Sequence, residues 1–332
     1  MRVTDLIKQL PTTTQREVLD CYKRYGVGVR EAIAKAIRLP LSWSDKEEGE
    51  AWTCSCSVEI DQIGYPTVIE RITIDDKFAL AANLQLWLPS LRGFRDRATE
   101  MIELSSRRTL TELTAVDIPG FSKKVEDSRA IADELIKQAA VEKFDLSEII
   151  LEVNQDVLGV FFFNSVEDGS RYRRKYSTQI CLYWGVIGLV ARLLGVSVEG
   201  LTITVLAHEY AHAYTHLGFD RSGGRWAGGA FGASEHELVE GLAQYWAAIA
   251  LERLESRLPE ALHAYKILLP KQPCAYRAHE PWLERYSPDT VAGALIRLRP
   301  NGALEYEEFC NELGRIAPTA KSENSMFRKT EV

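Results

Sequence analysis

The most constraining feature of the sequence is the segment His208-Glu209-Tyr210-Ala211-His212, which follows an apolar run over residues 201–207. The run contains no proline and no interior glycine, so we predict one helix that continues past the second histidine and ends at Gly218. Residues four apart lie on one face of a helix, about 6 Å apart along its axis. The imidazoles of His208 and His212 can therefore bind the same metal ion.

Glu209 follows the first of these histidines. One position along a helix is a rotation of about 100°, so the Glu209 carboxylate points beside the ion and not at it. That is where a general base for a metal-bound water must stand. The histidines are also unevenly distributed, since the first 207 residues contain none and four lie between residues 208 and 236. The alternative is a helix with two buried, hydrogen-bonded histidines and no metal.

His216 continues the series, eight residues after His208. Eight residues of helix rise by about 12 Å, whereas a bond from zinc to nitrogen measures about 2 Å, so His216 cannot share the ion. We expect His216 to be exposed to solvent, to complement the C-terminal helix dipole or to support a ligand indirectly.

A catalytic zinc site needs a third protein ligand and an open position for water. After a glycine-rich loop, Ser234 and Glu237 form a capping box, which predicts that a second helix begins there. Glu240 lies inside this helix among small and apolar residues, where a carboxylate needs a partner. We predict Glu240 as the third ligand, with Glu237, one turn earlier, as its rival.

The two motifs together, His208-Glu209-x-x-His212 and Glu240-Gly241-Leu242-Ala243-Gln244-Tyr245, resemble those of the gluzincin zinc metallopeptidases. The resemblance covers residues 201–250. It implies a zincin-like catalytic domain that hydrolyses peptide bonds. It also implies that the two histidines and Glu240 bind Zn²⁺ and that Glu209 is the general base.

The sequence departs from the gluzincin pattern in two ways. The spacing from His212 to Glu240 is longer than in the compact gluzincins because of the glycine-rich loop, and Gln244 stands where several of those families have an aspartate. The metzincin pattern fails, since Thr215 and Gly218 occupy the positions where it requires a glycine and a third ligand.

Peptide hydrolysis builds negative charge on the carbonyl oxygen, and a cation or hydroxyl donor beside the metal stabilises that charge. Gluzincins typically supply this group from a tyrosine or histidine downstream of the glutamate. By that resemblance Tyr276, Arg277 and His279 are candidate catalytic residues, with Tyr286 behind them. The alternative for each of them is a structural role.

Composition narrows the class of protein. The 332 residues, 46% hydrophobic and 26% charged, fit an ordinary soluble chain of two or three domains. A net charge of −7 without a basic run argues against a nucleic-acid partner. The segment 1–8 carries charges where a signal peptide needs an apolar core, so we expect a cytoplasmic protein. The apolar stretch 180–191 ends at Arg192 and is too short for a membrane span.

We expect an α+β fold in three parts: a helical and small β-sheet region (1–141), a zincin-like metallopeptidase domain (142–318) and a disordered tail (319–332). The first region could be an adaptor, recruit substrates or hold the enzyme inactive. The rival to an enzyme is a non-catalytic zincin-fold protein that acts by binding, with the metal absent or held in a closed site of four protein ligands.

Local patterns place the elements. In the first region we predict helices that break at Gly26 and Gly28, two antiparallel strands, and two further helices (52–60, 68–74; 91–115, 122–141). In the second region we predict two strands and one helix before the metal-binding helix (148–163, 177–184; 185–195). By the zincin resemblance, Gln179 to Tyr183 is a candidate edge strand to which an extended peptide adds. The alternative is an interior strand without a substrate role.

Overall fold

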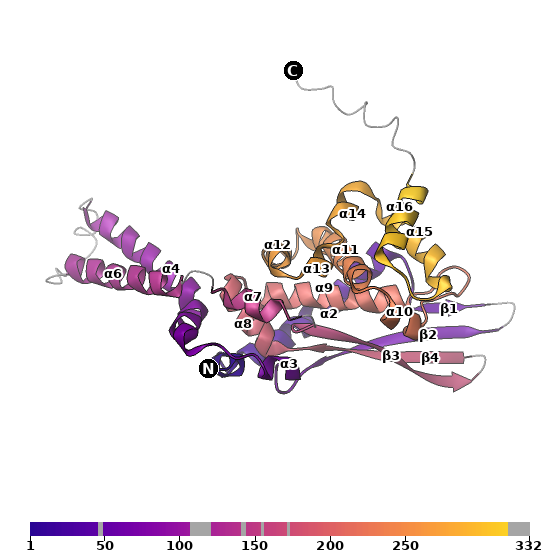
Figure 1. Cartoon of the computed structure of the whole chain (residues 1–332), viewed down its shortest axis with the longest axis horizontal. Helices are drawn as coiled ribbons and strands as arrows, with labels where there is room; N and C mark the ends of the chain where they lie inside the picture. Colours follow the sequence, from indigo (N-terminus) through magenta and orange to yellow (C-terminus); the bar gives the residue numbers. More distant parts are fainter. Residues whose placement is uncertain (46–48, 107–120, 141–143, 154–155, 171–172, 318–332) are drawn as a thin grey trace, which may run out of the picture.

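The computed structural model describes residues 1–45, 49–106, 121–140, 144–153, 156–170 and 173–317. Within these ranges the chain combines many helices with one four-stranded mixed sheet, which confirms the predicted α+β class. Figure 1 shows the sheet along one side of the body, with α9 lying over it and a pair of long helices projecting away at the other end.

The sheet has the strand order β1–β2–β4–β3. The strands are β1 (Ser42–Ser44), β2 (Ala51–Ile60), β3 (Gly159–Ser170) and β4 (Arg173–Leu182). β2 runs parallel to β4, while β1–β2 and β3–β4 are antiparallel pairs. β4 has a partner on both sides, so the two edge strands of the described sheet are β1 and β3.

The helix α9 (Val198–Leu217) lies at the centre of the fold. The Ser197 hydroxyl caps its start by accepting a hydrogen bond of 3.0 Å from the backbone N–H of Gly200. Every residue from Gly200 to Leu217 is buried, as expected for a helix with protein on all sides. The helices that pack against it are α2 (Thr14–Ile37), α11 (His236–Leu254) and α12 (Pro259–Leu268), and β3 and β4 cover a further side.

The projecting pair in Figure 1 consists of α4 (Ala79–Ser106) and α6 (Phe121–Ala139), which pack against each other. The short helix α7 (Leu146–Leu151) leads from this pair back to the body. The other helices are α1 (Val3–Ile7), α3 (Thr67–Glu70), α8 (Trp184–Leu194), α10 (Gly228–Ala233), α13 (Cys274–Arg277), α14 (Glu280–Arg285), α15 (Pro288–Leu298) and α16 (Tyr306–Ile316). Three 3₁₀ turns complete the described elements: η1 (Asp76–Phe78), η2 (Leu269–Lys271) and η3 (Arg299–Asn301).

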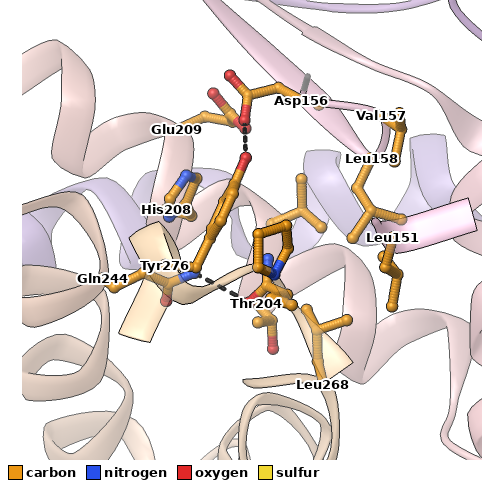
Figure 2. A pocket seen from close by; sticks show the side chains of 14 residues that line it. Leu151, Asp156, Val157, Leu158, Thr204, His208, Glu209, Gln244, Leu268 and Tyr276 are labelled. Atoms are coloured by element: carbon orange, nitrogen blue, oxygen red, sulfur yellow. Dashed lines mark hydrogen bonds between the residues drawn. The ribbon is translucent and has the colours of Figure 1, made fainter. Parts of the chain in front are cut away.

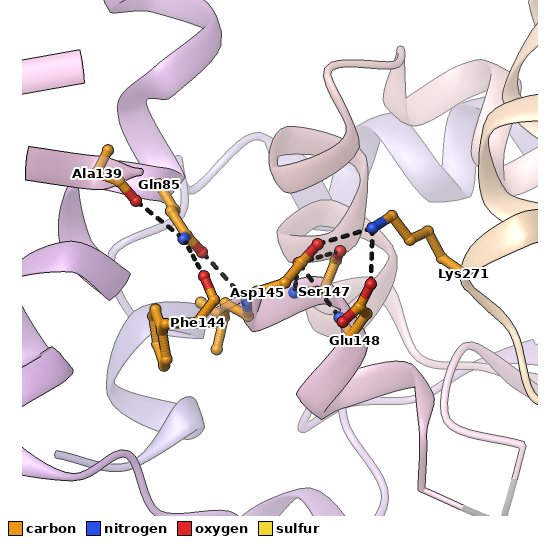
Figure 3. A network of polar contacts seen from close by, with 8 residues as sticks. Gln85, Ala139, Phe144, Asp145, Ser147, Glu148 and Lys271 are labelled. Atoms are coloured by element: carbon orange, nitrogen blue, oxygen red, sulfur yellow. Dashed lines mark hydrogen bonds and ion pairs between the residues drawn. The ribbon is translucent and has the colours of Figure 1, made fainter. Parts of the chain in front are cut away.

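Gln85 joins the projecting helices to α7, as Figure 3 shows. Its amide nitrogen donates to the carbonyl oxygens of Ala139, at 3.1 Å, and Phe144, at 2.9 Å. Its amide oxygen accepts from the backbone N–H of Leu146, at 3.1 Å. One side chain of α4 therefore satisfies backbone groups at the end of α6 and at the start of α7.

A lysine joins α7 to the turn η2. Lys271 Nζ lies 2.8 Å from Asp145 Oδ2 and 2.9 Å from Glu148 Oε1 (Figure 3). Asp145 also caps α7 by accepting from the backbone N–H groups of Ser147 and Glu148. These groups are partly exposed, so the ion pairs position the turn and contribute on the order of 1 kcal/mol or less each.

Three local predictions are wrong because tertiary burial overrides the local signal. α2 continues through Gly26 and Gly28, and its buried face offsets a cost of about 1 kcal/mol per glycine. The predicted strand at 68–74 is instead the helix α3 followed by an isolated bridge at Thr73. The predicted strand from 148 begins as α7, and the strand itself starts only at Gly159.

Two predicted helix signals also act differently. The predicted end of α9 at Gly218 is confirmed, but that glycine has φ −65° and ψ 133°, so the helix ends without a left-handed cap. Ser234 and Glu237 form no capping box. The Ser234 hydroxyl instead donates to Ala230 and accepts from the backbone N–H of Leu304, so it ends α10 and holds the C-terminal segment.

The hydrophobic core draws on both of the regions expected from the sequence. It forms one cluster that runs from Val3 in α1 to Leu313 in α16. β2, from the first region, is inserted beside β4, from the second. The expected boundary at 141 and the expected tail, 319–332, lie outside the described residues. None of the helices in the described ranges is long and apolar enough to cross a membrane.

Candidate metal centre

Three side chains from two helices meet in the interior. His208 and His212 come from α9, and Glu240 comes from α11. The two imidazole Nε2 atoms are 3.0 Å apart, and Glu240 Oε2 lies 3.1 Å from that of His208 and 3.5 Å from that of His212. All three residues are buried. In the part of the chain that the structure describes, they are the one group of three or more His, Cys, Asp or Glu that could hold a metal ion.

The spacing of these three atoms fits a tetrahedral ion. Ligand atoms about 2.0–2.1 Å from such an ion are separated from one another by about 3.3–3.4 Å. The observed separations of 3.0, 3.1 and 3.5 Å bracket that value. Glu240 Oε2 is also buried without a hydrogen-bond donor. A cation would satisfy this oxygen, so the donor set suits a metal.

The other candidate ligands lie apart from this group. Glu237 is exposed on the outer face of α11. The ring of His236 is half-exposed, with its Nδ1 3.9 Å from Glu240 Oε1, and it is not part of the convergent set. His216 does not join the ligands, as predicted, but the expectation of solvent exposure is wrong. Its ring is fully buried and stacks on Phe231, with 4.8 Å between ring centroids.

Glu209 lies beside the ligands and is held by the edge strand. Its carboxylate accepts a hydrogen bond from the backbone N–H of Phe161 in β3, while its Oε2 is buried without a partner. A Cβ on Gly159 would stand 3.0 Å from Glu209 Oε1 and 2.8 Å from Val205 Cγ1. Only a residue without a side chain lets β3 pass this close to the carboxylate.

Asp156, which the sequence analysis did not single out, belongs to the same site. It lies directly before β3 and accepts a hydrogen bond from the Tyr276 hydroxyl. Figure 2 shows its carboxylate next to that of Glu209, with the Tyr276 hydroxyl pointing toward the two. The one signal in the sequence is an acidic residue at the start of an apolar run, Val157 to Phe163.

The three residues predicted to stabilise the oxyanion lie in different places. Tyr276 is buried and stacks on His208, with ring centroids 5.6 Å apart. His279 is buried behind it, and its two ring nitrogens are occupied by the Tyr265 hydroxyl and the Tyr276 carbonyl. Arg277 pairs with Glu280 at the surface and does not line the cavities beside the metal centre. Tyr276 is the one that faces the metal centre.

Burial and charge shift the ionisation of the site. Burial raises the pKa of Glu209 well above its ordinary value, and Asp156 and Glu240 raise it further. Burial raises the pKa of Asp156 as well, with Glu240 adding to the shift. For Glu240 burial alone would raise the pKa, but His212 and His208 hold it below the ordinary value. The electrostatic result is a ligand carboxylate kept charged and two carboxyls on which negative charge is costly.

Two cavities flank the metal centre and share Asp156. The first is lined by His208, Glu209 and Tyr276, and leaves about 30 Å³ free to solvent (Figure 2). The second leaves about 510 Å³ free and runs along β3, whose residues 160–163 form one wall, with the other two ligands in its floor. The cleft is therefore narrow on one side of the ligands and wide on the other.

The strand that we predicted to be at the edge of the sheet lies in its interior. Residues 179–182 belong to β4, which pairs with β2 on one side and β3 on the other, so they have no free edge. β3 is an edge strand, and it is also the strand that borders the wide cavity. The strand available to an extended ligand is therefore β3.

No family model matches the chain, and neither a curated protein nor a solved structure matches it.

Proposed function

We propose that this chain is a zinc-dependent peptidase. The observation that carries the proposal is the convergence of His208, His212 and Glu240 on one point, with the carboxylate of Glu209 beside them facing a cavity. A closed structural site would need a fourth protein ligand, and the convergent set within the described residues has three members. Three ligands with an open position are typical of catalytic zinc.

The donor set favours zinc among the biological metals. Imidazole nitrogens are borderline ligands that suit zinc, zinc also accepts a carboxylate oxygen, and the separations of the three atoms suit four-coordinate geometry. Calcium and magnesium prefer six or more oxygen ligands, which this group does not offer. Zinc in such a site lowers the pKa of a bound water toward neutrality and polarises a carbonyl.

The residues around the ligands supply the remaining chemistry. Glu209 takes a proton from the attacking water and delivers it to the leaving amine, and the Phe161 N–H fixes its orientation. Burial and the charges of Asp156 and Glu240 raise the pKa of Glu209, which makes its carboxylate a stronger base. Tyr276 places a hydroxyl beside the same carboxylate; this hydroxyl donates to Asp156, and by turning toward a bound substrate it would donate to the oxygen that gains charge.

The substrate in this proposal is an extended peptide. Among the described strands none pairs with the outer side of β3, and apart from Phe161, whose N–H binds Glu209, an extended chain can pair with its backbone as an added strand. The adjoining wide cavity has an aromatic lining from Phe161, Phe163 and Phe231, which offers contacts for apolar side chains. Main-chain pairing with apolar contacts favours a peptide over a small polar substrate.

The test is metal analysis followed by cleavage of a peptide library. We expect purified protein to contain about one zinc per chain and to release fragments that a chelator abolishes. Glu209→Gln should retain the zinc and lose turnover by about 10²–10⁴-fold, because it removes the base and leaves the ligands. Glu237→Gln, an exposed carboxylate on α11, is the matched control and should behave like the wild type. Full turnover in Glu209→Gln, or tightly bound zinc without any cleavage, would refute the proposal.

A further inference from the structure

Asp156 is the one acidic group of the cleft that the proposed chemistry leaves without a task. Glu240 binds the metal in that proposal and Glu209 moves the proton. Asp156 accepts a hydrogen bond from Tyr276, and within the described residues it forms no ion pair with a lysine or arginine. Burial and the charge of Glu240 make a negative charge at this place costly, and the two histidines and the Tyr276 hydroxyl offset part of that cost. Since no described lysine or arginine pairs with the Asp156 carboxylate, a cationic group of a ligand would stabilise it.

The position of Asp156 indicates which molecule would supply this cation. Asp156 lines both the narrow cavity and the wide cavity, so it stands at the point where they meet beside the ligands. A peptide that lies along β3 with its scissile bond at the ligands must pass this point. The cation is then part of the peptide, on the side of the scissile bond that faces the narrow cavity.

The narrow cavity limits how much peptide can extend on that side. Its 30 Å³ has room for about two water molecules, and its inner wall is apolar, formed by Leu151, Leu158 and Leu268. A small side chain fits this space and a continuing chain does not. The wide side, with about 510 Å³ along β3, accepts several residues. A cleft with so little room on one side of the ligands favours the removal of residues from one end of a chain.

We infer that Asp156 binds the α-ammonium group of a peptide and that the narrow cavity holds its first side chain, so that the enzyme releases single small residues from the amino end. The inference rests on the proposed peptidase function. In the reaction the first peptide C–N bond breaks, the water oxygen joins the carbonyl carbon, and one water proton goes to the leaving amine. The products are a free amino acid and the shortened peptide.

The experiment compares one hexapeptide, Ala-Ala-Gly-Phe-Ala-Ala, with its N-acetylated twin on the zinc-loaded full chain. Mass spectrometry identifies the products, and initial rates give kcat and KM. We expect the wild type to release alanine from the free peptide and to act at least tenfold more slowly on the acetylated one. Asp156→Asn should raise KM for the free peptide at least tenfold and remove the preference, because it deletes a buried charge pair. Glu148→Gln, a carboxylate outside the cleft, is the control.

The outcomes separate this inference from the proposed function. Internal cleavage of both peptides at equal rates overturns the ammonium site and leaves the peptidase function standing. An equal loss on both peptides in Asp156→Asn shows that Asp156 only positions Tyr276, which also overturns it. If neither peptide is cleaved, calorimetric titration of the zinc-loaded Glu209→Gln variant decides. Tighter binding of the free peptide supports the ammonium site, and equal or undetectable binding overturns it.

Discussion

His216 makes the acid stability of this protein predictable. Its ring is fully buried beside Phe161 and Phe231, and neither ring nitrogen has a hydrogen-bond partner. Burial and, to a smaller extent, the charge of Arg225 together lower the pKa of His216 to about 3. The native protein therefore holds this imidazole neutral at pH values where an unfolded chain protonates it.

The sign and size follow from proton linkage. Between the unfolded pKa near 6.5 and the folded pKa of about 3, the unfolded state binds one more proton, so stability falls as the pH falls through this window. At pH 4 the difference spans about 2.5 pH units, which is about 3 kcal/mol at about 1.4 kcal/mol per unit. Above pH 6.5 this histidine contributes no pH dependence.

The assay is urea denaturation of metal-free protein at pH 7 and pH 4, for the wild type and His216→Leu. Leucine is similar in size and cannot take a proton, so the variant should lose about 3 kcal/mol less than the wild type between the two pH values. His263→Gln, which replaces an exposed histidine, should follow the wild type. Comparing changes with pH, and not absolute stabilities, cancels the packing effect of the substitution. Parallel profiles for wild type and His216→Leu would refute the reasoning.

Three further substitutions test other parts of the structure. Glu240→Gln should lose most of the bound zinc by elemental analysis, whereas Glu237→Gln should keep it; the reverse result would make Glu237 the ligand. Gly159→Ala should keep zinc but lower kcat by about 10²-fold, because the new Cβ displaces the carboxylate of the general base; an unchanged kcat would contradict the close approach. Arg299→Met should lower the free energy of unfolding by about 3–5 kcal/mol, since its buried guanidinium pairs with a carboxylate and two carbonyls. The exposed Arg38→Met should cost less than about 1 kcal/mol, and similar losses for both would refute the distinction.

Much of the helical part of the fold could be predicted from the sequence because helix signals are local. The start of α8 and the end of α9 lie close to their predicted positions. The errors fall where tertiary contacts overrule local signals. Gly26 and Gly28 read as breaks, yet α2 passes through both with a buried face. The stretch 68–74 is predicted to be a strand, yet residues 67–70 form the helix α3, with Ile69 buried.

Some residues of the candidate site could likewise be predicted from the sequence, and others could not. The four-residue spacing of His208 and His212 lies within one helix, so their convergence could be predicted from helix geometry, whereas Glu240, on a second helix, could be predicted only from its apolar neighbours and the resemblance to gluzincins. Asp156 and Phe161 reach the site through the path of β3, which no periodicity describes. Their places depend on how a strand passes over a helix, and that is a property of the assembled fold.

The strand order explains the largest error in the predicted site. β3 and β4 are neighbours in sequence and form a hairpin, and nothing within the hairpin decides which of them is the edge. β2 determines which strand is the edge. It comes from more than a hundred residues earlier in the chain and pairs in parallel with β4. That pairing leaves residues 179–182 without a free edge and β3 outermost on this side, so Gly159 and Phe161 approach Glu209, and Asp156 lines both cavities. A chain lacking residues 42–60 should therefore lose the described order of the cleft even though it keeps every residue of the metal centre.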